Sequence, residues 1–578
     1  MYADNRGVRM TVIESRGSRG ADRSKKLLRS LEYATDIKNF RVSADGTLVK
    51  RPKSRLLYKF NSAVDGMIRC YIGGSVHTIV AFASRLIEIA DDGTLSSIGW
   101  VGTGGNLMFY FNGSIYAINK NGMYSYDGTT FDTVSGYVPC VLTACTPDGA
   151  GTPFEQINLI TSERRQQYCA DGSAKRYRIT EDGVEAVTAV TVNGTALTDG
   201  WVYDETANAV DFTSAPAKGL NNVEIRYRTA TNAADRERIF GCRFAMQFGG
   251  NSDGRIFLWG NDKYPNYRFY SELAGGVPSV DYFPVNNYTV IGNSSITSIV
   301  QQYDRQLIFT PDSAYYSYCE LKTDALGNTV SSFPVFSLNG SKGCIFRTNG
   351  CSIDNRPVTL CRDGLNLWES TTVENEKNAV CFSAPLGDYF GSAGSDGFAI
   401  ADVQFLRELL FSDGTNCFVY NYGNGAWYGY TGMGFDSYTS YGNDFLYSVK
   451  GAIYIMSADG SAAGTVPECV WEAKNISPGS EGRADITGFF TDVSISGDVK
   501  LKLTFTPGDG SGAKNVTFAY PAGTNRSFRL ECRPMLKRVG PFGIRMSVSG
   551  AGDCDIHGMG IVIRNRERNY RNGISKRN

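Results

Sequence analysis

Only two histidines, His77 and His557, are present in the 578 residues, and they limit the chemistry that this chain could carry out. A serine or cysteine nucleophile needs a base, usually histidine, within hydrogen-bond reach, and a third group that orients the base. His77 lies in the apolar run SVHTIVAF and His557 in CDIHGMGIVI, so both are expected to be structural residues of strands. The sequence therefore predicts no catalytic residue of this type.

Two further kinds of site were weighed, one built on carboxylates and one on glycines. The string nearest to a sialidase-type Asp box is RDGLNLW at 362–368, which lacks the spacing of that motif and is typical of an ordinary hairpin. The glycines of VGTGGN at 101–106 precede neither a Lys-Ser/Thr pair nor a helical pattern, so no phosphate-binding loop is predicted.

Fourteen cysteines are present, but none forms a C-x-x-C pair. With two histidines, a Cys/His metal site would need ligands gathered from remote segments, so we predict no metal site and no cofactor. We expect free and mostly buried thiols. Disulfides stay open as an alternative if the protein leaves the cell after assembly in a reducing compartment.

Turn dipeptides are the strongest structural signal in the chain. Twenty-one Asp-Gly or Asn-Gly steps occur, most of them between short runs of apolar, aromatic and β-branched residues. Both central residues of a type I′ turn need positive φ, which glycine takes freely and Asn or Asp tolerate, so such steps indicate hairpins. The pattern predicts a mostly antiparallel all-β chain. The exception is residues 22–35, where Asp22 as a candidate N-cap and a leucine face predict one short helix.

The fold class that we expect is all-β: a β-propeller of six or seven blades with an inserted β-sandwich and a C-terminal β-sandwich. Strand-turn-strand units that end in Tyr or Trp recur on both sides of a segment richer in Thr and Ala, and the last hundred residues alternate with period two. The predicted boundaries are a basic N-terminal arm (1–36), the first part of the propeller (37–140), the inserted sandwich (141–232), the remainder of the propeller (233–476), and the C-terminal sandwich with a basic tail (477–578).

Charges cancel over the whole chain, with 58 Lys plus Arg against 58 Asp plus Glu, but both ends are basic. Residues 1–60 hold fifteen basic and six acidic side chains, and residues 561–578 hold six and one. These ends are either solvated, partly disordered tails or docking segments for an acidic partner or for nucleic-acid phosphates. The N-terminus lacks the apolar core of a signal peptide, and no apolar run is long enough to cross a bilayer, so we expect neither export by a signal peptide nor a membrane-spanning segment.

Aromatic residues are abundant, with 33 Tyr, 32 Phe and 6 Trp. Packing between blades, contacts between subunits and glycan recognition are three readings of this content.

Two segments carry a resemblance to a known family. In residues 34–57, ATDIKNFRVSADGTLVKRPKSRLL, a D-G-x-L-x-K-R-P string is formed by Asp45, Gly46, Leu48, Lys50, Arg51 and Pro52. Residues 238–319 contain YRFYSE followed by LIFTPDSAY. These stretches resemble the opening and the central section of the tail tubular protein B family, the tail nozzle or tail hub β-propeller proteins of short-tailed bacteriophages.

The resemblance implies a structural virion protein and not an enzyme. Copies would form a homo-oligomeric ring, which we expect to be hexameric, below the portal and adaptor proteins of the head-to-tail connector, with tail fibres or distal tail proteins as further partners. Genomic dsDNA would pass through the lumen without specific binding, so we expect a neutral or acidic lining. The location would be the virion tail, assembled in the bacterial host cytoplasm.

Basic residues of the two ends are the predicted protein-interface residues, with acidic surfaces of the adaptor or of neighbouring subunits as their partners. They are Arg51, Lys53, Arg55, Arg564, Arg566, Arg568 and Arg571. The alternative function is a receptor-binding or glycan-degrading β-propeller at the tail tip. A bacterial surface-layer or adhesion propeller is a third reading, which the missing signal sequence disfavours.

Overall fold

Strands make up almost all of the regular structure, which confirms the all-β class. The computed structural model describes the chain except for residues 1–2, 5–7, 26, 251–252, 324–328, 371–377, 393–397, 458–465, 479–482 and 567–578. Within the described residues the α-helical structure is α1 (Ala233–Phe240), whose N-cap Asn232 accepts hydrogen bonds from the backbone of Ala234 and Asp235. The described part of the chain contains no helix with the length and apolar character needed to cross a bilayer.

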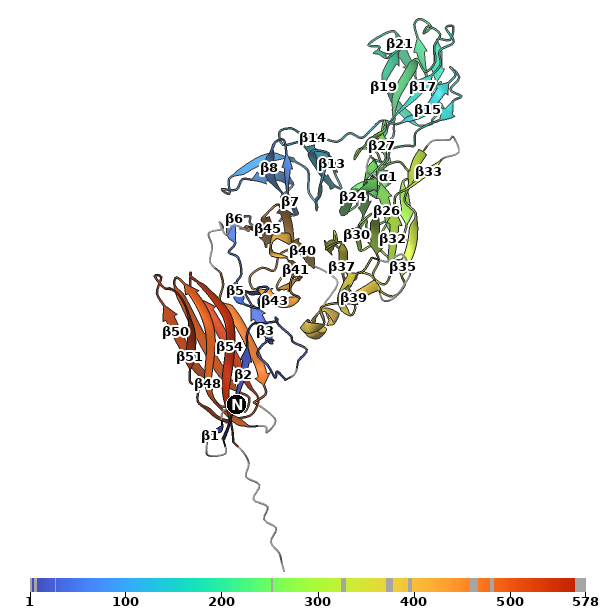
Figure 1. Cartoon of the computed structure of the whole chain (residues 1–578). Helices are drawn as coiled ribbons and strands as arrows, with labels where there is room; N and C mark the ends of the chain where they lie inside the picture. Colours follow the sequence, from blue (N-terminus) through green and yellow to red (C-terminus); the bar gives the residue numbers. More distant parts are fainter. Residues whose placement is uncertain are drawn as a thin grey trace, which may run out of the picture.

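Six four-stranded antiparallel sheets and one four-stranded antiparallel part of a nine-stranded sheet form the middle of the molecule, and we number these seven units as sheets one to seven in chain order (Figure 1). Sheet one is β7 (Gly66–Ile72), β8 (Ser75–Phe82), β9 (Arg85–Ile89) and β10 (Leu95–Trp100). Sheet two is β11 (Leu107–Phe111), β12 (Ser114–Asn119), β13 (Gly122–Tyr126) and β14 (Phe131–Thr133). Sheet three is β24 (Phe244–Gly250), β25 (Asp253–Trp259), β26 (Tyr267–Tyr270) and β29 (Tyr288–Val290). Sheet four is β30 (Ser298–Gln302), β31 (Arg305–Phe309), β32 (Ala314–Tyr318) and β35 (Val335–Asn339).

The last three of these sheets complete the series. Sheet five is β36 (Cys351–Ile353), β37 (Arg356–Cys361), β38 (Gly364–Trp368) and β39 (Ala379–Cys381). Sheet six is β40 (Ala399–Val403), β41 (Glu408–Ser412), β42 (Cys417–Asn421) and β43 (Ala426–Tyr430). Sheet seven is β44 (Ser437–Tyr441), β45 (Asp444–Val449), β46 (Ala452–Ser457) and β6 (Arg55–Lys59). Short hairpins are added by β27 (Leu273–Ala274) with β28 (Val277–Pro278) and by β33 (Glu320–Thr323) with β34 (Thr329–Ser332).

The seven sheets follow one another in a closed cycle. The first strands of successive sheets are in contact. Strand β7 contacts β11, and β11 contacts β24; likewise β30 contacts β36, β36 contacts β40, and β40 contacts β44. Strand β44 of the last sheet contacts β7 of the first. Sheets three and four share a core cluster that includes Trp259 and Ile299. Strand β6 comes from before sheet one in the sequence but completes sheet seven, so the start of the chain closes the cycle. We call this part of the molecule the ring.

An eight-stranded sheet and the last four strands of the nine-stranded sheet, which we call the terminal sheets, lie below the ring in Figure 1. One contains β1 (Ala3–Asp4), β2 (Val8–Ser15), β4 (Phe40–Val42), β5 (Leu48–Lys50), β48 (Ala484–Ser496), β51 (Asn525–Cys532), β52 (Leu536–Val539) and β54 (Asp553–Arg566). The other contains β47 (Cys469–Ile476), β49 (Val499–Pro507), β50 (Lys514–Tyr520) and β53 (Phe542–Ser549). The two sheets share one core, in which the rings of Phe489 and Phe505 lie 5.6 Å apart. Strand β3 (Asp36–Lys38) pairs with both β43 and β47, so this second sheet continues into sheet six.

The helix predicted for residues 22–35 is wrong. The segment consists of turns, bends and isolated bridges in its described residues, because Leu28 and Leu31 are buried against distant parts of the chain, whereas Leu27 is exposed. Leu28 bridges to Ile476 and is 2% exposed, and the Asp22 carboxylate accepts from the backbone and hydroxyl of Ser24 instead of capping a helix. Tertiary burial outweighs the weak helical pattern here.

The predicted N-terminal arm also differs from the structure. Strand β2 pairs with β54 along its whole length, from Val8 opposite Arg566 to Ser15 opposite Met559. Strands β3, β4 and β5, which we had assigned to the first blades, pair with the terminal sheets and sheet six. The first sixty residues therefore form a strap that holds the terminal sheets and the ring together.

The segment predicted as an insertion projects from the ring near sheets two and three (Figure 1). It consists of a six-stranded sheet that packs on a three-stranded sheet. The six-stranded sheet contains β15 (Cys140–Cys145), β16 (Thr152–Pro153), β17 (Glu163–Tyr168), β19 (Val184–Val192), β20 (Thr195–Ala196) and β23 (Val223–Thr229). The three-stranded sheet contains β18 (Arg176–Arg178), β21 (Trp201–Asp204) and β22 (Ala209–Phe212). One core cluster fills the space between them and includes Tyr168 and Tyr177. The separation from the ring is incomplete, because Leu159 and Ile160 pack with Phe283 in the core of sheet three.

Candidate functional site

The family-like string from Asp45 to Pro52 forms a turn and the strand β5. The Asp45 carboxylate accepts hydrogen bonds from Ser43 and from the backbone and hydroxyl of Thr47, and these bonds lower the pKa of Asp45 to about 2. Leu48 is 1% exposed in the core of the terminal sheets, and the Lys50 ammonium donates to the Gly550 carbonyl at 3.0 Å. Each of these contacts fixes the strap onto the terminal sheets.

Arg51 lies in the interior and not on an interface. Its side chain is 8% exposed, and its guanidinium carbon lies 5.2 Å from the centre of the Tyr430 ring. A nitrogen of the same group is 3.6 Å from the sulfur of Met433. This arrangement assigns Arg51 a structural contact between the strap and sheet six, in place of the contact with an acidic partner that we expected.

The other predicted interface residues lie at the surface or outside the described part of the chain. Lys53 and Arg55 are half-buried in the strap, and Arg55 donates to the Asp91 carbonyl at 2.7 Å. Arg564 is half-buried on β54, opposite Asp485 of β48. Arg566 ends β54, and its side chain lies outside the described residues, as do Arg568 and Arg571. The interface role of these residues stays a prediction.

A cleft of about 680 Å³ lies where the strap meets sheet six. Three carboxylates line it, those of Asp22, Glu32 and Asp45. Each already has a partner: Asp22 binds Ser24, Glu32 lies 3.4 Å from a guanidinium nitrogen of Arg19, and Asp45 holds its turn. A general acid for glycoside hydrolysis needs a raised pKa, whereas the pKa of Asp45 is lowered. The three carboxylates of this cleft therefore make structural contacts within the strap.

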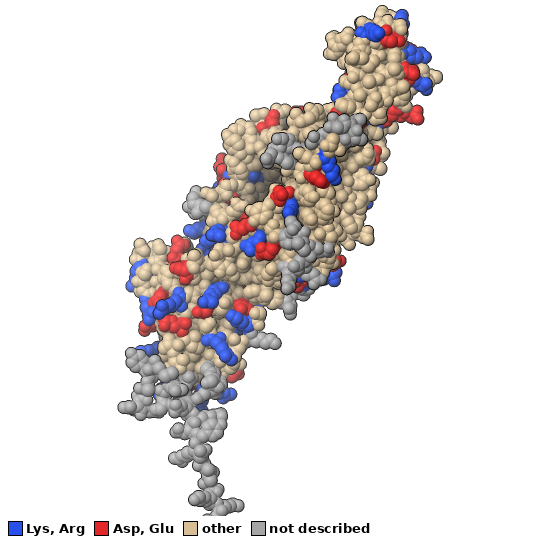
Figure 2. Space-filling model, turned by 45° about the vertical axis from the view of Figure 1, so that its right-hand side comes forward, with Lys and Arg blue, Asp and Glu red and all other residues tan. Residues whose placement is uncertain are grey.

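Basic and acidic side chains are interspersed on the face shown in Figure 2. Many are paired, as in the two-point contact of Arg529 with Asp492 at 2.8 and 2.9 Å and in the pairing of Arg176 with Asp211. Binding to a nucleic-acid backbone needs many unneutralised basic groups along one track. This face does not offer a continuous track of that kind.

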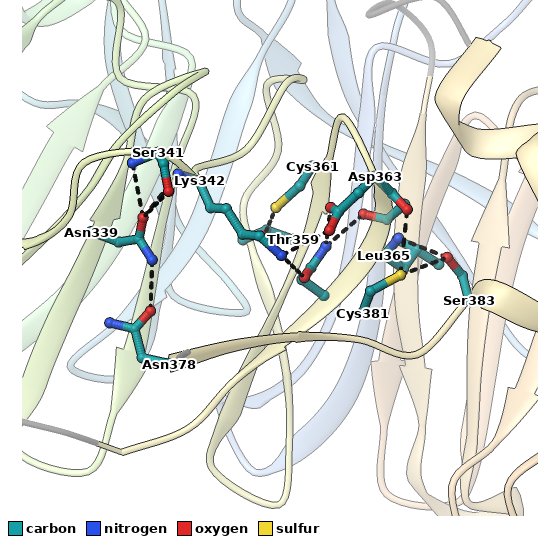
Figure 3. Close-up of polar contacts among 12 residues, drawn as sticks. Asn339, Ser341, Lys342, Thr359, Cys361, Asp363, Leu365, Asn378, Cys381 and Ser383 are labelled. Carbon is teal, nitrogen blue, oxygen red and sulfur yellow. Dashed lines mark hydrogen bonds and ion pairs between the residues drawn. The ribbon is translucent and has the colours of Figure 1, made fainter. Parts of the chain in front are cut away.

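The string RDGLNLW forms a hairpin, as predicted: β37 pairs with β38, and Cys361 lies opposite Gly364 across the turn. Asp363 is held there by Lys342 at 2.8 Å and by the Asn366 amide at 2.8 Å (Figure 3). Burial works to raise the pKa of Asp363. The hydrogen bonds from Lys342 and Asn366 and the charge of Lys342 together outweigh burial, so the pKa of Asp363 is lowered. Ser383 accepts from the Leu365 backbone at 2.9 Å in the same network. The network holds sheets four and five together.

Both histidines are hydrogen-bonded through both ring nitrogens. His77 on β8 has the Ser75 hydroxyl 2.8 Å from Nε2 and a Glu88 carboxylate oxygen 2.7 Å from Nδ1. His557 on β54 has the Ser494 hydroxyl 2.7 Å from Nε2, and the Thr47 hydroxyl 3.2 Å from Nδ1. Our sequence interpretation placed both in strands but did not find these partners.

All fourteen cysteines are free thiols, nine of them buried and five half-buried. Burial raises the pKa of Cys344 to about 11 and that of Cys361 to about 12, which keeps these thiols protonated and unreactive. Among the described residues, no group of three or more His, Cys, Asp and Glu side chains is arranged to hold a metal ion.

No protein-family model and no curated protein sequence matches this chain. Among solved structures, an exo-β-1,3-galactanase from Phanerochaete chrysosporium with galactose aligns at 8% identity over 55% of this chain and 95% of its own, with a TM-score of 0.20. PorZ, a surface component of the type-IX secretion system of Porphyromonas gingivalis, aligns at 9% identity over 80% of this chain and 46% of its own, with a TM-score of 0.32. The extracellular domain of a putative hybrid two-component system from B. thetaiotaomicron aligns at 10% identity over 75% and 58%, with a TM-score of 0.20. Likenesses this weak carry no argument about function.

Proposed function

We propose that this chain is a structural protein of a bacteriophage tail, a subunit of a hub or nozzle ring below the portal and adaptor. The observation that carries the proposal is the resemblance of residues 34–57 to the opening of the tail tubular protein B family. In support, this segment is the strap that joins the terminal sheets, sheet six and sheet seven. A subunit of a channel through which a genome passes must keep its shape, and strands that connect its parts stabilise that shape.

We further propose that the ring of seven sheets within one chain is a seven-bladed β-propeller. The insertion and the terminal sheets each form a β-sandwich in this proposal. In support, β6 from the start of the chain pairs with β46 of the last sheet, which joins the two ends of the series of sheets as in a closed propeller. The paired sheets of the insertion and of the chain end each enclose one core.

Assembly follows from this function. Copies of the chain form a closed ring, hexameric in our proposal, with the connector above and fibres or distal tail proteins as further partners. Genomic dsDNA passes through the central channel of this assembly without specific binding. The protein is then located in the virion tail after assembly in the host cytoplasm.

Electron microscopy and native mass spectrometry test the proposal. Images of intact particles of the virus that encodes this chain should show a ring of copies in the tail, and the purified chain should form rings alone or with its adaptor. A chain that stays monomeric and is missing from the tail would overturn the proposal. Specific binding on a glycan array, or release of oligosaccharides, would instead favour the tail-tip alternative.

A further inference from the structure

A serine, a histidine and a glutamate form a hydrogen-bonded chain on the two central strands of sheet one. Ser75 and His77 lie two residues apart on β8, and Glu88 lies on the adjacent strand β9. We propose that Ser75, His77 and Glu88 form a nucleophilic site that hydrolyses carboxylic esters, an activity that is separate from the proposed structural function.

The distances are those of a nucleophile, a base and a group that orients the base. The Ser75 hydroxyl lies 2.8 Å from His77 Nε2, and His77 Nδ1 lies 2.7 Å from a Glu88 carboxylate oxygen. An ionised carboxylate only accepts hydrogen bonds, so Nδ1 must carry the proton. The neutral imidazole then presents the lone pair of Nε2 to the serine hydroxyl, which is the arrangement that activates serine.

The site combines an accessible nucleophile with a sheltered base. Ser75 is exposed, whereas the His77 side chain is only 11% exposed and the Glu88 side chain 25%. The His77 ring packs edge-on against the ring of Tyr126 in sheet two, with centroids 6.2 Å apart. Water is thereby kept from most of the imidazole, which strengthens its bond to Glu88.

The surroundings leave room for a substrate. Ser75 directly follows the Gly73-Gly74 turn, in which both glycines have positive φ, 55° and 93°. A Cβ placed at Gly74 would meet no described atom within 4 Å outside its chain neighbours, so this turn borders solvent, whereas the Asp127-Gly128 turn of sheet two approaches Gly73 and the Nε2 side of His77. Tyr110 of sheet two is 44% exposed, and its cross-strand neighbour Ile115 packs in the core between sheets one and two. An aromatic surface therefore lies on the same side of sheet two as this site.

The second histidine of the chain shows which feature distinguishes this site. His557 has a serine on Nε2, but its Nδ1 faces the hydroxyl of Thr47 and not a carboxylate. The Thr47 hydroxyl donates its proton to Asp45, so it accepts from Nδ1–H, and only a neutral group lies directly against this nitrogen. A neutral hydroxyl stabilises an imidazolium less than a carboxylate does. Ser494 is therefore a matched control for Ser75.

The reaction needs only the ester and water. The Ser75 oxygen bonds to the carbonyl carbon while its proton moves to His77 Nε2, and that proton then passes to the departing alkoxide, which leaves as an alcohol. Water next attacks the acyl-serine and gives a proton to His77 Nε2. The bond between the serine oxygen and the acyl carbon breaks, the proton returns to Ser75, and the carboxylic acid is released.

Covalent labelling of the full chain with a fluorophosphonate, located by peptide mass spectrometry, tests the site. We expect one label, on Ser75, and burst hydrolysis of p-nitrophenyl acetate. Both should be lost in Ser75→Ala and His77→Gln and retained in Ser494→Ala. Glu88→Gln should slow acylation by about 10²- to 10⁴-fold while KM stays the same, as expected of a positioning residue.

Absence of the label, or equal labelling of Ser75→Ala and the wild type, would overturn the inference. If His77→Gln fails to fold, Ser75→Ala decides, because an exposed serine contributes little to stability. Assembly of several chains into an oligomeric ring is measured on the same Ser75→Ala sample by electron microscopy. A chain that forms rings but takes no label loses only the esterase site, and a labelled chain that never forms rings loses only the tail function.

Discussion

Arg41 of β4 and Glu408 of β41 form an ion pair that joins the strap to sheet six. Glu408 is completely buried, and its carboxylate also accepts hydrogen bonds from the hydroxyls of Tyr428 at 2.8 Å and Tyr430 at 2.7 Å. Burial works to lower the pKa of Arg41, but the charge and hydrogen bond of Glu408 and the nearby Tyr428 and Tyr430 together outweigh this effect and raise the pKa. The Arg41 guanidinium therefore stays charged, with Glu408 as its partner.

We expect Glu408→Gln to destabilise the protein strongly, because it leaves the Arg41 guanidinium without a counter-charge in the interior. Removing one member of a buried pair costs about 3–5 kcal/mol. Differential scanning calorimetry should show a clear fall in Tm. The control is Glu320→Gln, which breaks an exposed contact with Lys322 at 3.2 Å and should cost about 0–1 kcal/mol. Equal shifts in the two variants would contradict a structural role for the buried pair.

Asp45 should make stability depend on pH through the strap turn. Its pKa is lowered from 3.8 to about 2 in the folded chain by hydrogen bonds from Ser43 and Thr47. Because the folded-state pKa lies below the unfolded-state value, this stabilisation is present above about pH 4 and is lost as the pH falls toward about 2. Asp45→Asn should therefore lower Tm near pH 7, and the difference from the wild type should shrink in acid. Asp132→Asn, an exposed position on strand β14, is the control for the Asp-to-Asn change itself.

Hairpins were predictable from the sequence because their signals are local. Asn112 and Gly113, both with positive φ, join β11 to β12 as the turn chemistry predicts, and Asn121-Gly122 also marks a hairpin, although Gly122 there already begins β13 opposite Asn119. Pairing between distant strands was not predictable, since nothing in the residues of β6 indicates that β46, about four hundred positions later, is its neighbour. The same holds for β2 and β54 at the two ends of the chain. Closure of the ring positions β6, and burial within the terminal sheets positions β2.

In the candidate sites, too, contacts between residues far apart in the chain could not be predicted from the sequence. A basic string in a polar segment favours a surface, yet Arg51 is buried over the Tyr430 ring, a contact between residues far apart in the chain. The partners of His77 were missed for a smaller reason. Ser75 shares its face of β8 by simple alternation, but Glu88 reaches it only because β8 and β9 pair with Ile79 opposite Glu88. A one-residue change of this register would turn Glu88 to the other face.

Removal of residues 1–60 should prevent the chain from folding. The deletion takes away β6, which closes sheet seven, and β2, which covers the edge of β54. The stability of a domain is only about 5–15 kcal/mol, so the loss of these strands and of buried Leu48 is expected to exceed it. Dye binding and limited proteolysis should reveal exposed apolar surface.

Removal of residues 567–578 is the control for this deletion, because it leaves every described strand in place. The shortened chain should melt at the same temperature as the full chain. If the chain without residues 1–60 also melted like the full chain, the strap would not have the structural role that its pairing implies.

The fourteen thiols should divide into two classes in a reaction with Ellman's reagent. Nine are buried in the folded chain, and burial raises the pKa of thiols such as Cys70, which reaches about 11, so few are ionised at mildly alkaline pH. At most five should therefore react quickly under native conditions, and all fourteen should react after unfolding in guanidinium chloride. Cys319→Ser, at a half-buried position, should reduce only the fast class, whereas Cys361→Ser should reduce only the slow class. Rapid reaction of ten or more thiols in the native protein would mean that the sheets open readily, which a rigid ring subunit should not do.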